Sequence, residues 1–278
     1  MRILAFVPLL LLAGCTVIDT NDGASGEPKN NAEIVRIVLT RGLAGDEGVI
    51  NEYVAEDYKQ HNPMAEDGRA GLLGFVRSLK GVKVRIEIRR ALCDGDFVAV
   101  HSDAWFGDSH SAVFDLFIVR DGMLREHWDC IQQAGEKNAS GRTMTDGATE
   151  VSDRDKTEAN RTLVKEFFEK VVSGGDQSNM TRYLDAHYAE HNPGMADGIE
   201  ALKAMFEAMD KAGQTFKFTK LHRTIAEGNF VLTQCEGEMN GKRVAFYDLH
   251  RIENGKIVEH WDTMQEVPAT SKNKNGMF

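Results

Sequence analysis

The sequence predicts an α+β fold that is built twice, and three observations lead to this prediction. Glu126-His127-Trp128-Asp129 recurs letter for letter as Glu259-His260-Trp261-Asp262, and His61-Asn62-Pro63 recurs as His191-Asn192-Pro193. The nearly constant spacing between the copies indicates duplication. Within each copy, helical patterns precede strand-like runs. We therefore expect two tandem cone-shaped domains, each with three helices packed on a curved, mainly antiparallel sheet.

The first residues have the order of a bacterial export signal. Arg2 precedes an apolar run, Ile3–Leu12, that is too short to span a bilayer. Leu12-Ala13-Gly14-Cys15 resembles a lipobox, in which the cysteine receives a diacylglycerol. We expect a signal peptide over 1–14, lipidation of Cys15 and a polar tether over 15–30, which would anchor the exported protein to a membrane of the bacterial cell envelope. The alternative is a plain secretory signal with a chance cysteine.

Four segments are expected after the tether: a first domain over 31–133, a linker over 134–156, a second domain over 157–268 and a tail over 269–278. Apolar residues at helical spacing predict a first helix, which is clearest at Leu163, Val164, Phe167, Phe168, Val171 and Val172. A short second helix is predicted over Tyr53–Tyr58 and Tyr183–Tyr188, and the following Asn-Pro ends it. A third helix follows Asp67-Gly68 and Asp197-Gly198.

The second half of each domain has the pattern of a sheet. β-branched and aromatic residues dominate from Val82 and Thr215 onward. Turn-forming pairs interrupt these runs at Asp94-Gly95, Asp121-Gly122, Asn240-Gly241 and Asn254-Gly255. The pattern predicts strands joined by hairpins, four in each domain.

Two motifs resemble a known family. Tyr-x-x-His-Asn-Pro precedes Asp-Gly and a helix, and Asp248–Gln265 reads Asp-Leu-x-Arg-x-x-x-Gly-x-x-x-Glu-His-Trp-Asp-x-x-Gln. Both resemble the nuclear transport factor 2-like superfamily and, within it, the SnoaL-like domains of polyketide cyclases and predicted aldol-condensation proteins. The resemblance covers both copies, although Ile118 replaces the arginine in the first. It implies the cone fold and an acid/base aspartate on the penultimate strand, matching Asp115 and Asp248, with a histidine on the neighbouring strand that matches His101.

The loop of the last hairpin decides which polar residues meet. A three-residue loop, Glu253-Asn254-Gly255, would place Asp248 opposite His260, whereas a two-residue loop would place it opposite Trp261. We favour the three-residue loop, with an odd-length loop after Trp105, because it separates polar from apolar side chains. One sheet face of the first domain would then carry His101, Asp103, Asp115, His127 and Asp129. The other face would carry Val98, Val100, Phe114, Leu116, Ile118, Leu124 and Trp128.

A carboxylate flanked by imidazoles in an apolar cone is suited to acid/base catalysis, because burial raises its pKa while a neighbouring imidazolium lowers it. We expect Asp115 to act in the first domain, tuned by His101 and His127. In the second domain the equivalent pair is Asp248 and His260. The alternative is that the two strand histidines only satisfy the aspartates as buried hydrogen-bond partners.

Gln234 stands where the first domain has His101, which makes the first domain the better catalytic candidate. The expected ligand contacts come from the two His-Asn-Pro regions and from this glutamine: Tyr58, His61, Asn62, Tyr188, His191, Asn192 and Gln234. The amides of Asn62 and Asn192 can donate to a carbonyl or enolate oxygen. The alternatives are that the histidines of these regions cap the second helix and that the tyrosines pack helix against sheet.

The net charge of -10, with no basic stripe, excludes nucleic acid as a partner. We expect no cofactor, because phosphate loops, nucleophile elbows and dinucleotide fingerprints are missing from the sequence. We also expect no metal, because a triad of His101, His127 and an aspartate lacks local ligand spacing.

Two functions remain. One is acid/base catalysis of an aldol-type condensation, cyclisation or isomerisation of a small apolar carbonyl compound. The other is a non-catalytic envelope lipoprotein whose cones bind a small apolar ligand or a protein partner. We expect the copies to pack as an internal pseudo-dimer through the face of Trp128 and Leu116.

Overall fold

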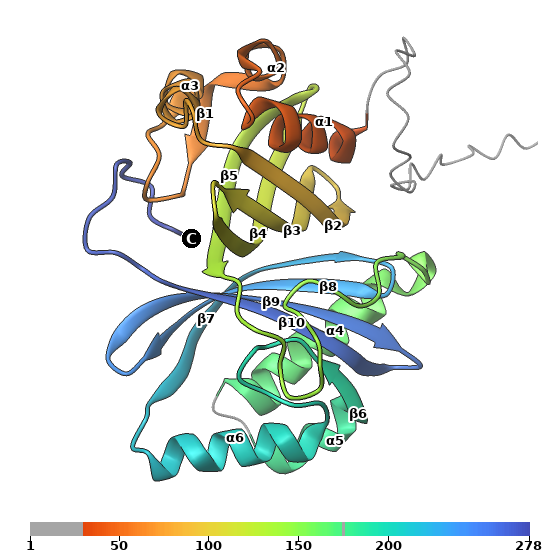
Figure 1. Ribbon diagram of the computed structural model, residues 1–278. Helices are drawn as coiled ribbons and strands as arrows, with labels where there is room; N and C mark the ends of the chain where they lie inside the picture. The colour runs from red at the N-terminus through yellow and green to blue at the C-terminus, as the bar shows by residue number, and fades with distance from the viewer. Residues whose placement is uncertain (1–29, 174–175) are drawn as a thin grey trace, which may run out of the picture.

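The structure, a computed structural model, describes residues 30–173 and 176–278. Cys15 and the predicted signal peptide lie outside these residues. The described chain forms two repeats, each with short helices on one five-stranded sheet (Figure 1). Within it, no helix is both long and apolar enough to cross a membrane. The predicted α+β class with two tandem domains is confirmed.

The elements of the first repeat are, in order, α1 (Asn31–Ile37), the π-helical turn η1 (Val38–Gly42), α2 (Glu47–Tyr53), β1 (Val54–Gln60), α3 (Gly68–Ser78), β2 (Val84–Asp94), β3 (Phe97–Phe106), β4 (Ser109–Arg120) and β5 (Met123–Gln133). Those of the second are η2 (Arg154–Lys156), α4 (Thr157–Phe167), η3 (Phe168–Val172), η4 (Gln177–Asn179), α5 (Met180–Tyr183), β6 (Leu184–Glu190), α6 (Ile199–Lys211), β7 (Phe216–Glu227), β8 (Phe230–Met239), β9 (Lys242–Glu253) and β10 (Lys256–Glu266).

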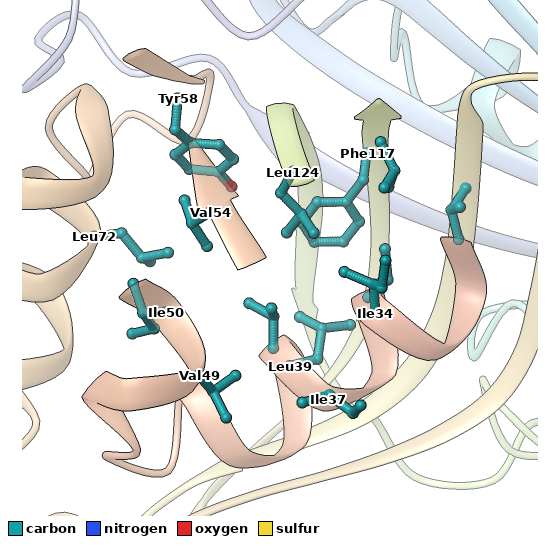
Figure 2. Packing of buried hydrophobic residues seen from close by; sticks show 14 of the residues in the cluster. Ile34, Ile37, Leu39, Val49, Ile50, Val54, Tyr58, Leu72, Phe117 and Leu124 are labelled. Carbon is teal, nitrogen blue, oxygen red and sulfur yellow. The ribbon is translucent and has the colours of Figure 1, made fainter. Parts of the chain in front are cut away.

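Capping residues and one apolar cluster hold the helices of the first repeat against its sheet. Asn30 accepts a hydrogen bond from the Glu33 amide at 2.9 Å, and Asp46 accepts one from the Val49 amide at 3.3 Å, which satisfies donors at the helix starts. Behind these caps, buried side chains of helices and strands meet: Ile34, Ile37, Leu39, Val49, Ile50, Val54, Tyr58, Leu72, Phe117 and Leu124 (Figure 2). The first repeat therefore has a core of its own between its helices and its sheet.

Most of the predicted second helix is a strand. In the first repeat the helix ends at Tyr53, and β1 then pairs in parallel with β5; β6 pairs in the same way with β10. The spacing of Val54 and Tyr58 fits one face of a helix, but the edge of the last strand supplies backbone partners that override this local preference. Each sheet therefore has five strands rather than four, in the orders β1-β5-β4-β3-β2 and β6-β10-β9-β8-β7.

The last hairpin has a two-residue loop, not the predicted three-residue loop. Its residues Asn254 and Gly255 have φ of 50° and 72°, as a type I′ turn requires. A β-bulge at Val258 then shifts the pairing, so that Asp248 lies opposite Asp262. The first repeat has the same turn and the same bulge. The extra residue of the bulge shifts the pairing by one position. The aspartate of the penultimate strand therefore lies on the same sheet face as the histidine of the last strand, as a three-residue loop would also have placed it.

Each sheet has one face toward its own helices and one face toward the other sheet (Figure 1). His101 pairs with Phe114 and Val100 pairs with Asp115, so His101 and Asp115 point to opposite faces. The cause is the two-residue turn at Gly107-Asp108, where an odd-length loop was predicted. The predicted grouping of His101 and Asp103 with Asp115 is therefore wrong, and so is the predicted apolar face. The pairing places Val98, Val100, Asp115, His127 and Asp129 toward the helices, and His101, Asp103, Phe114, Leu116 and Trp128 toward the other sheet.

A second apolar cluster combines residues from both sheets. Trp128 and Trp261 are both buried in it. The guanidinium carbon of Arg223, from the second repeat, lies 4.1 Å from the ring centre of Trp128. Arg90, from the first repeat, covers Trp261 at the same distance. Each tryptophan of the repeated motif thus contacts a cation of the other repeat, which cation–π attraction favours.

Candidate functional site

A cavity of about 890 Å³ lies in the second repeat, between α4, α6 and the sheet. Its walls contain many phenylalanine and methionine side chains: Phe167, Phe168, Phe206, Phe216, Phe218, Phe246, Met180, Met195, Met205, Met209, Met239 and Met264. Polar residues also line it, among them Tyr188, Glu190, Asn192, Thr233, Asp248, His250, His260 and Asp262. A mostly apolar cavity of this size with a few convergent polar groups has the character of a small-molecule site.

Glu190 and His260 form a buried ion pair in this cavity. Both carboxylate oxygens of Glu190 lie 3.0 Å from His260 Nδ1, and the carboxylate also accepts the amides of His191 and Asn192. Burial opposes both charges, but their attraction outweighs it: the pKa of Glu190 is lowered, and the pKa of His260 is raised well above its usual value. His260 therefore carries two protons near neutral pH, and its Nε2 lies 3.4 Å from Asp248 Oδ1.

Asp262 lies beside this pair and titrates near neutrality. It is 8% exposed, and burial is the main cause that raises its pKa to about 7. His260 opposes the shift, whereas the carboxylates of Glu190 and Asp248 add to it. Asn192 Nδ2 donates to the carboxyl group, at 3.0 and 2.9 Å from its two oxygens. A carboxyl group that is half ionised at neutral pH can both take up and return a proton.

His250 is a second imidazole at the cavity. Burial, followed by the positive charge of His260, lowers the pKa of His250 to about 3, so its ring is neutral at ordinary pH. Its ring centre lies 5.1 Å from that of His260. Among the described residues, its Nδ1 has no hydrogen-bond partner. An unpaired nitrogen of a neutral ring offers a ligand either an acceptor or a donor, according to the tautomer.

The first repeat holds a less charged version of this cluster. His127 Nε2 lies 3.0 Å from Asp115 Oδ1, and its Nδ1 lies 2.9 Å from Gln60 Oε1, where the second repeat has a glutamate. Asn62 donates to Asp129 at 2.5 Å. Burial raises the pKa of Asp129 to about 6, and His127 opposes this shift. The expected contact between Asp115 and His127 is present, whereas a phenylalanine replaces the second imidazole.

Three residues of this first cluster have the geometry of metal ligands. One ligand atom from each of Asp115, His127 and Asp129 lies within 4.8 Å of the other two, and all three residues are buried. The trio differs from the triad weighed from the sequence, because His101 lies on the other face of the sheet. The hydrogen bond between Asp115 and His127 already satisfies one atom of each. The arrangement therefore also suits a shared proton.

His101 and Gln234 lie outside both clusters. His101 Nδ1 is 3.1 Å from Arg90, and Gln234 donates to the Tyr247 hydroxyl at 2.6 Å. Both side chains are buried on the face toward the other repeat. The expectation that His101 tunes Asp115 is wrong, and Gln234 does not line the cavity. Their difference therefore gives no reason to prefer the first domain as the catalytic one.

His61 and His191 also point toward the other repeat. His61 stacks on Trp128 with ring centres 4.6 Å apart, and its Nε2 lies 2.8 Å from Glu126. His191 makes the equivalent two contacts in the second repeat. These histidines brace the last strand and do not line the cavity, contrary to their predicted role in ligand binding. Of the other predicted ligand residues, Asn192 and Tyr188 line the cavity and Asn62 contacts the equivalent cluster, and their role in ligand binding stays a prediction.

The SnoaL-like domain family matches residues 39–127 and 164–260, which together make up more than half of the chain. The chain belongs to the SnoaL-like family. Both repeats are thus SnoaL-like domains of the nuclear transport factor 2-like type, as the motifs indicated. A comparison with curated proteins gives no significant match.

Several solved structures are similar to one repeat of this SnoaL-like chain. A proposed ketosteroid isomerase from Kribbella flavida is 24% identical, with 37% of this chain and 78% of that chain covered and a TM-score of 0.34. A proposed polyketide cyclase from Bacillus cereus is 21% identical, with coverage of 36% and 71% and a TM-score of 0.32. An LEH-like epoxide hydrolase from M. tuberculosis is 20% identical, with coverage of 40% and 85% and a TM-score of 0.33. At these identities the likeness leaves the reaction of this chain open.

Among the cavity residues of this SnoaL-like chain that were not predicted as site residues are Asp262, Glu190 and His250. Asp262 had a usable signal, because it follows His260 by two positions on a strand and so shares its face. Glu190 directly precedes the second His-Asn-Pro motif, and only its difference from Gln60 marks it. His250 lies two positions after Asp248 on the penultimate strand, so strand alternation would have found it as well.

Proposed function

We propose that this SnoaL-like protein is an enzyme that applies acid/base catalysis to a small apolar carbonyl compound held in the cavity of the second repeat. The observation that carries the proposal is a carboxyl group with a pKa of about 7, Asp262, on the wall of a mostly apolar cavity. An acid/base group works best when its pKa lies near the working pH. The first repeat serves in this proposal as a structural partner.

The proposed step is proton transfer from the carbon next to a carbonyl group. The Asp262 carboxylate takes the proton, and the electron pair of the broken C–H bond forms an enolate. His260 Nε2 donates a hydrogen bond to the enolate oxygen and stabilises it. This donor is available because its contact with Asp248 Oδ1 is long, at 3.4 Å. Return of the proton from Asp262 to another carbon completes an isomerisation. Attack of the enolate carbon on a second carbonyl group instead forms the carbon–carbon bond of an aldol-type condensation or cyclisation; the π bond of that carbonyl group breaks, and its oxygen takes the proton held by Asp262.

The test does not require the natural substrate. An enzyme that forms enolates exchanges the α-protons of simple apolar ketones for deuterium in D₂O, and NMR measures the rate. We expect Asp262→Asn to lose roughly 100-fold of the catalysed rate. Asp129→Asn, the equivalent change in the first repeat, should keep it. The wild-type rate should rise with pH through about 7, because the carboxylate is the base. Exchange that is unaffected by Asp262→Asn would contradict the proposal.

A second candidate is ligand binding without turnover, which the many phenylalanine and methionine side chains of the cavity favour. Methionine-rich walls adapt to ligands of varied shape. Under this alternative an apolar ketone binds the cavity, and Leu202→Trp, which narrows it, weakens binding, but no variant changes the rate of deuterium exchange. Titration calorimetry combined with the NMR assay separates the two candidates.

We further propose that the protein is anchored to a membrane of the bacterial cell envelope through lipid on Cys15. The order of residues in Arg2 to Cys15 supports this proposal. Cys15→Ala should move the protein from the membrane fraction to the soluble fraction after cell lysis. If the variant stays with the membranes, the lipid assignment is wrong.

We also propose that the two repeats work as an internal pseudo-dimer. Reciprocal contacts between equivalent residues support this, since such contacts are typical of two-fold interfaces. The Gln132 side chain accepts from the Met264 amide, and the Gln265 side chain accepts from the Ile131 amide, both at 2.8 Å.

A further inference from the structure

The pattern Lys-Asn-x-x-Gly recurs outside the two domains. Lys137-Asn138-Ala139-Ser140-Gly141 follows the first repeat, and Lys272-Asn273-Lys274-Asn275-Gly276 follows the second. We call residues 137–143 arm one and residues 271–277 arm two. Arm two runs back from β10 to lie beside β1 and α3 of the first repeat (Figure 1). Each arm contacts the repeat that it does not directly follow.

Arm two holds the His-Asn-Pro loop of the first repeat. Asn273 Nδ2 donates to the carbonyl oxygens of Asn62 and Ala65, at 2.7 and 3.0 Å. Asn275 Nδ2 donates to the Asp67 carboxylate at 2.7 Å. Both carbonyls lie beyond the end of β1 at Gln60, so no strand pairs with them; the Asn62 carbonyl also accepts the Ala65 amide at 3.2 Å. The arm therefore fixes the backbone that carries the side chain of Asn62.

Arm one makes the equivalent contacts with the second repeat. Asn138 Nδ2 donates to the carbonyl oxygen of Glu190 at 2.6 Å and lies 3.4 Å from that of Asn192. Arg142 forms a two-pronged ion pair with Asp197, with Nε and Nη2 at 2.9 and 2.8 Å from its two oxygens. The second repeat thus depends for its loop on a segment that comes directly from the first.

The residues that arm one holds belong to the cavity. The Glu190 side chain pairs with His260, and the Asn192 side chain donates to Asp262. Asn138 is 6% exposed, and its Oδ1 accepts two amides of its own arm, so its Nδ2 is held in a fixed direction. A shift of the loop would move both cavity side chains relative to the carboxyl group that titrates near neutrality.

We propose that the two arms are exchanged between the repeats and that arm one, through Asn138, positions Glu190 and Asn192 for the acid/base site of the second repeat. The positioning part rests on the proposed function, whereas the exchange of arms does not. Asn138 touches no ligand in this proposal and acts only through the loop. The site in the second repeat is therefore complete only when the first repeat supplies its arm.

The test compares Asn138→Ala with Asn273→Ala in the full chain. Hydrogen exchange measured by mass spectrometry reports on amides in 188–198 and in 58–68. We expect Asn138→Ala to speed exchange in 188–198 roughly tenfold and to leave 58–68 unchanged, because a buried hydrogen bond of about 1.4 kcal/mol is lost. Asn273→Ala should do the reverse. Asn138→Asp keeps the acceptor that orders the arm, replaces the donor by a carboxylate oxygen and adds a negative charge, so it covers the case in which the alanine variant fails to fold.

A second measurement tests positioning separately from loop protection. In the ketone exchange assay, Asn138→Ala, which adds no charge, should shift the pH at which the rate is half-maximal, whereas Asn273→Ala should not. The proposed exchange of arms is refuted if Asn138→Ala leaves hydrogen exchange in 188–198 unchanged and Asn273→Ala leaves it unchanged in 58–68. It is also refuted if each variant speeds hydrogen exchange equally in both segments. A crossed hydrogen-exchange pattern with an unchanged pH profile refutes the positioning role. A crossed hydrogen-exchange pattern in the two variants, together with wild-type protein that exchanges no ketone protons, supports the exchange of arms and counts against the proposed function alone.

Discussion

Ionisation of Asp262 should cost the folded protein stability, and Asp262→Asn should remove this cost. The pKa is about 7 in the folded chain against an ordinary value of 3.8, a difference of 7 − 3.8 = 3.2 units. At 1.36 kcal/mol per unit this is about 4 kcal/mol. Because the folded pKa is raised, the corresponding stability is fully present below pH 4, falls as pH rises toward 7 and is lost above it. Asparagine has no proton to lose, so the variant lacks this decline.

Urea unfolding followed by circular dichroism at pH 4.5 and pH 8 measures the effect. At pH 4.5 the variant should exceed the wild type by only about 1 kcal/mol, because asparagine has the shape of the protonated aspartate that the folded wild type still contains. At pH 8 we expect the free energy of unfolding of the variant to exceed that of the wild type by about 2–4 kcal/mol, allowing for relaxation around the charge. Asp108→Asn, at an exposed turn, is the control and should change little. A difference between Asp262→Asn and wild type that is the same at both pH values would refute the raised pKa.

Two further changes test the cavity and the contact between the sheets. His250→Phe, which copies the first repeat, should move the midpoint of acid unfolding to lower pH. The reason is that the pKa of His250 is about 3 in the folded chain and 6.5 in the unfolded chain, so the wild type loses stability as pH falls below 6.5. An unchanged midpoint, followed by circular dichroism, would contradict this. Arg90→Met should lower the free energy of unfolding by about 3 kcal/mol, since the guanidinium covers Trp261 and donates to three linker carbonyls. Arg125→Met, which removes only long surface ion pairs, should cost less than about 1 kcal/mol, and equal losses in the two variants would count against the role of Arg90.

The repeats, and the position of the helices before the four antiparallel strands of each sheet, were readable from the sequence, because duplication preserves the spacing of apolar residues. The face on which a strand residue lies was not readable, because it depends on whether a turn has an even or odd number of residues. One residue more at Gly107-Asp108 would have brought His101 to the side of Asp115. At the last hairpin two misjudged features cancelled: the loop is one residue shorter than predicted, and the bulge at Val258 compensates.

The cavity itself had no signal in the sequence. Both repeats have the same polar motifs and the same helical spacing, yet the large cavity described above lies in the second repeat. Its volume depends on how side chains such as Met205 and Phe206 pack over the sheet, and local patterns do not determine packing at this level. The replacement of Gln60 by Glu190 changes the charge of the cluster, but its meaning appears only when Glu190 is seen beside His260.

The stacking around the two motif tryptophans gives the protein an intrinsic fluorescent reporter. Trp128 and Trp261 each lie between a histidine of their own repeat and an arginine of the other. Any event that separates the sheets exposes both indoles to water and removes a cation from each, so emission should shift to longer wavelength. The chain has three tryptophans, and Trp105→Phe would leave only these two to emit. Spectroscopy on unlabelled protein could then follow the two repeats parting, independently of what happens inside the cavity.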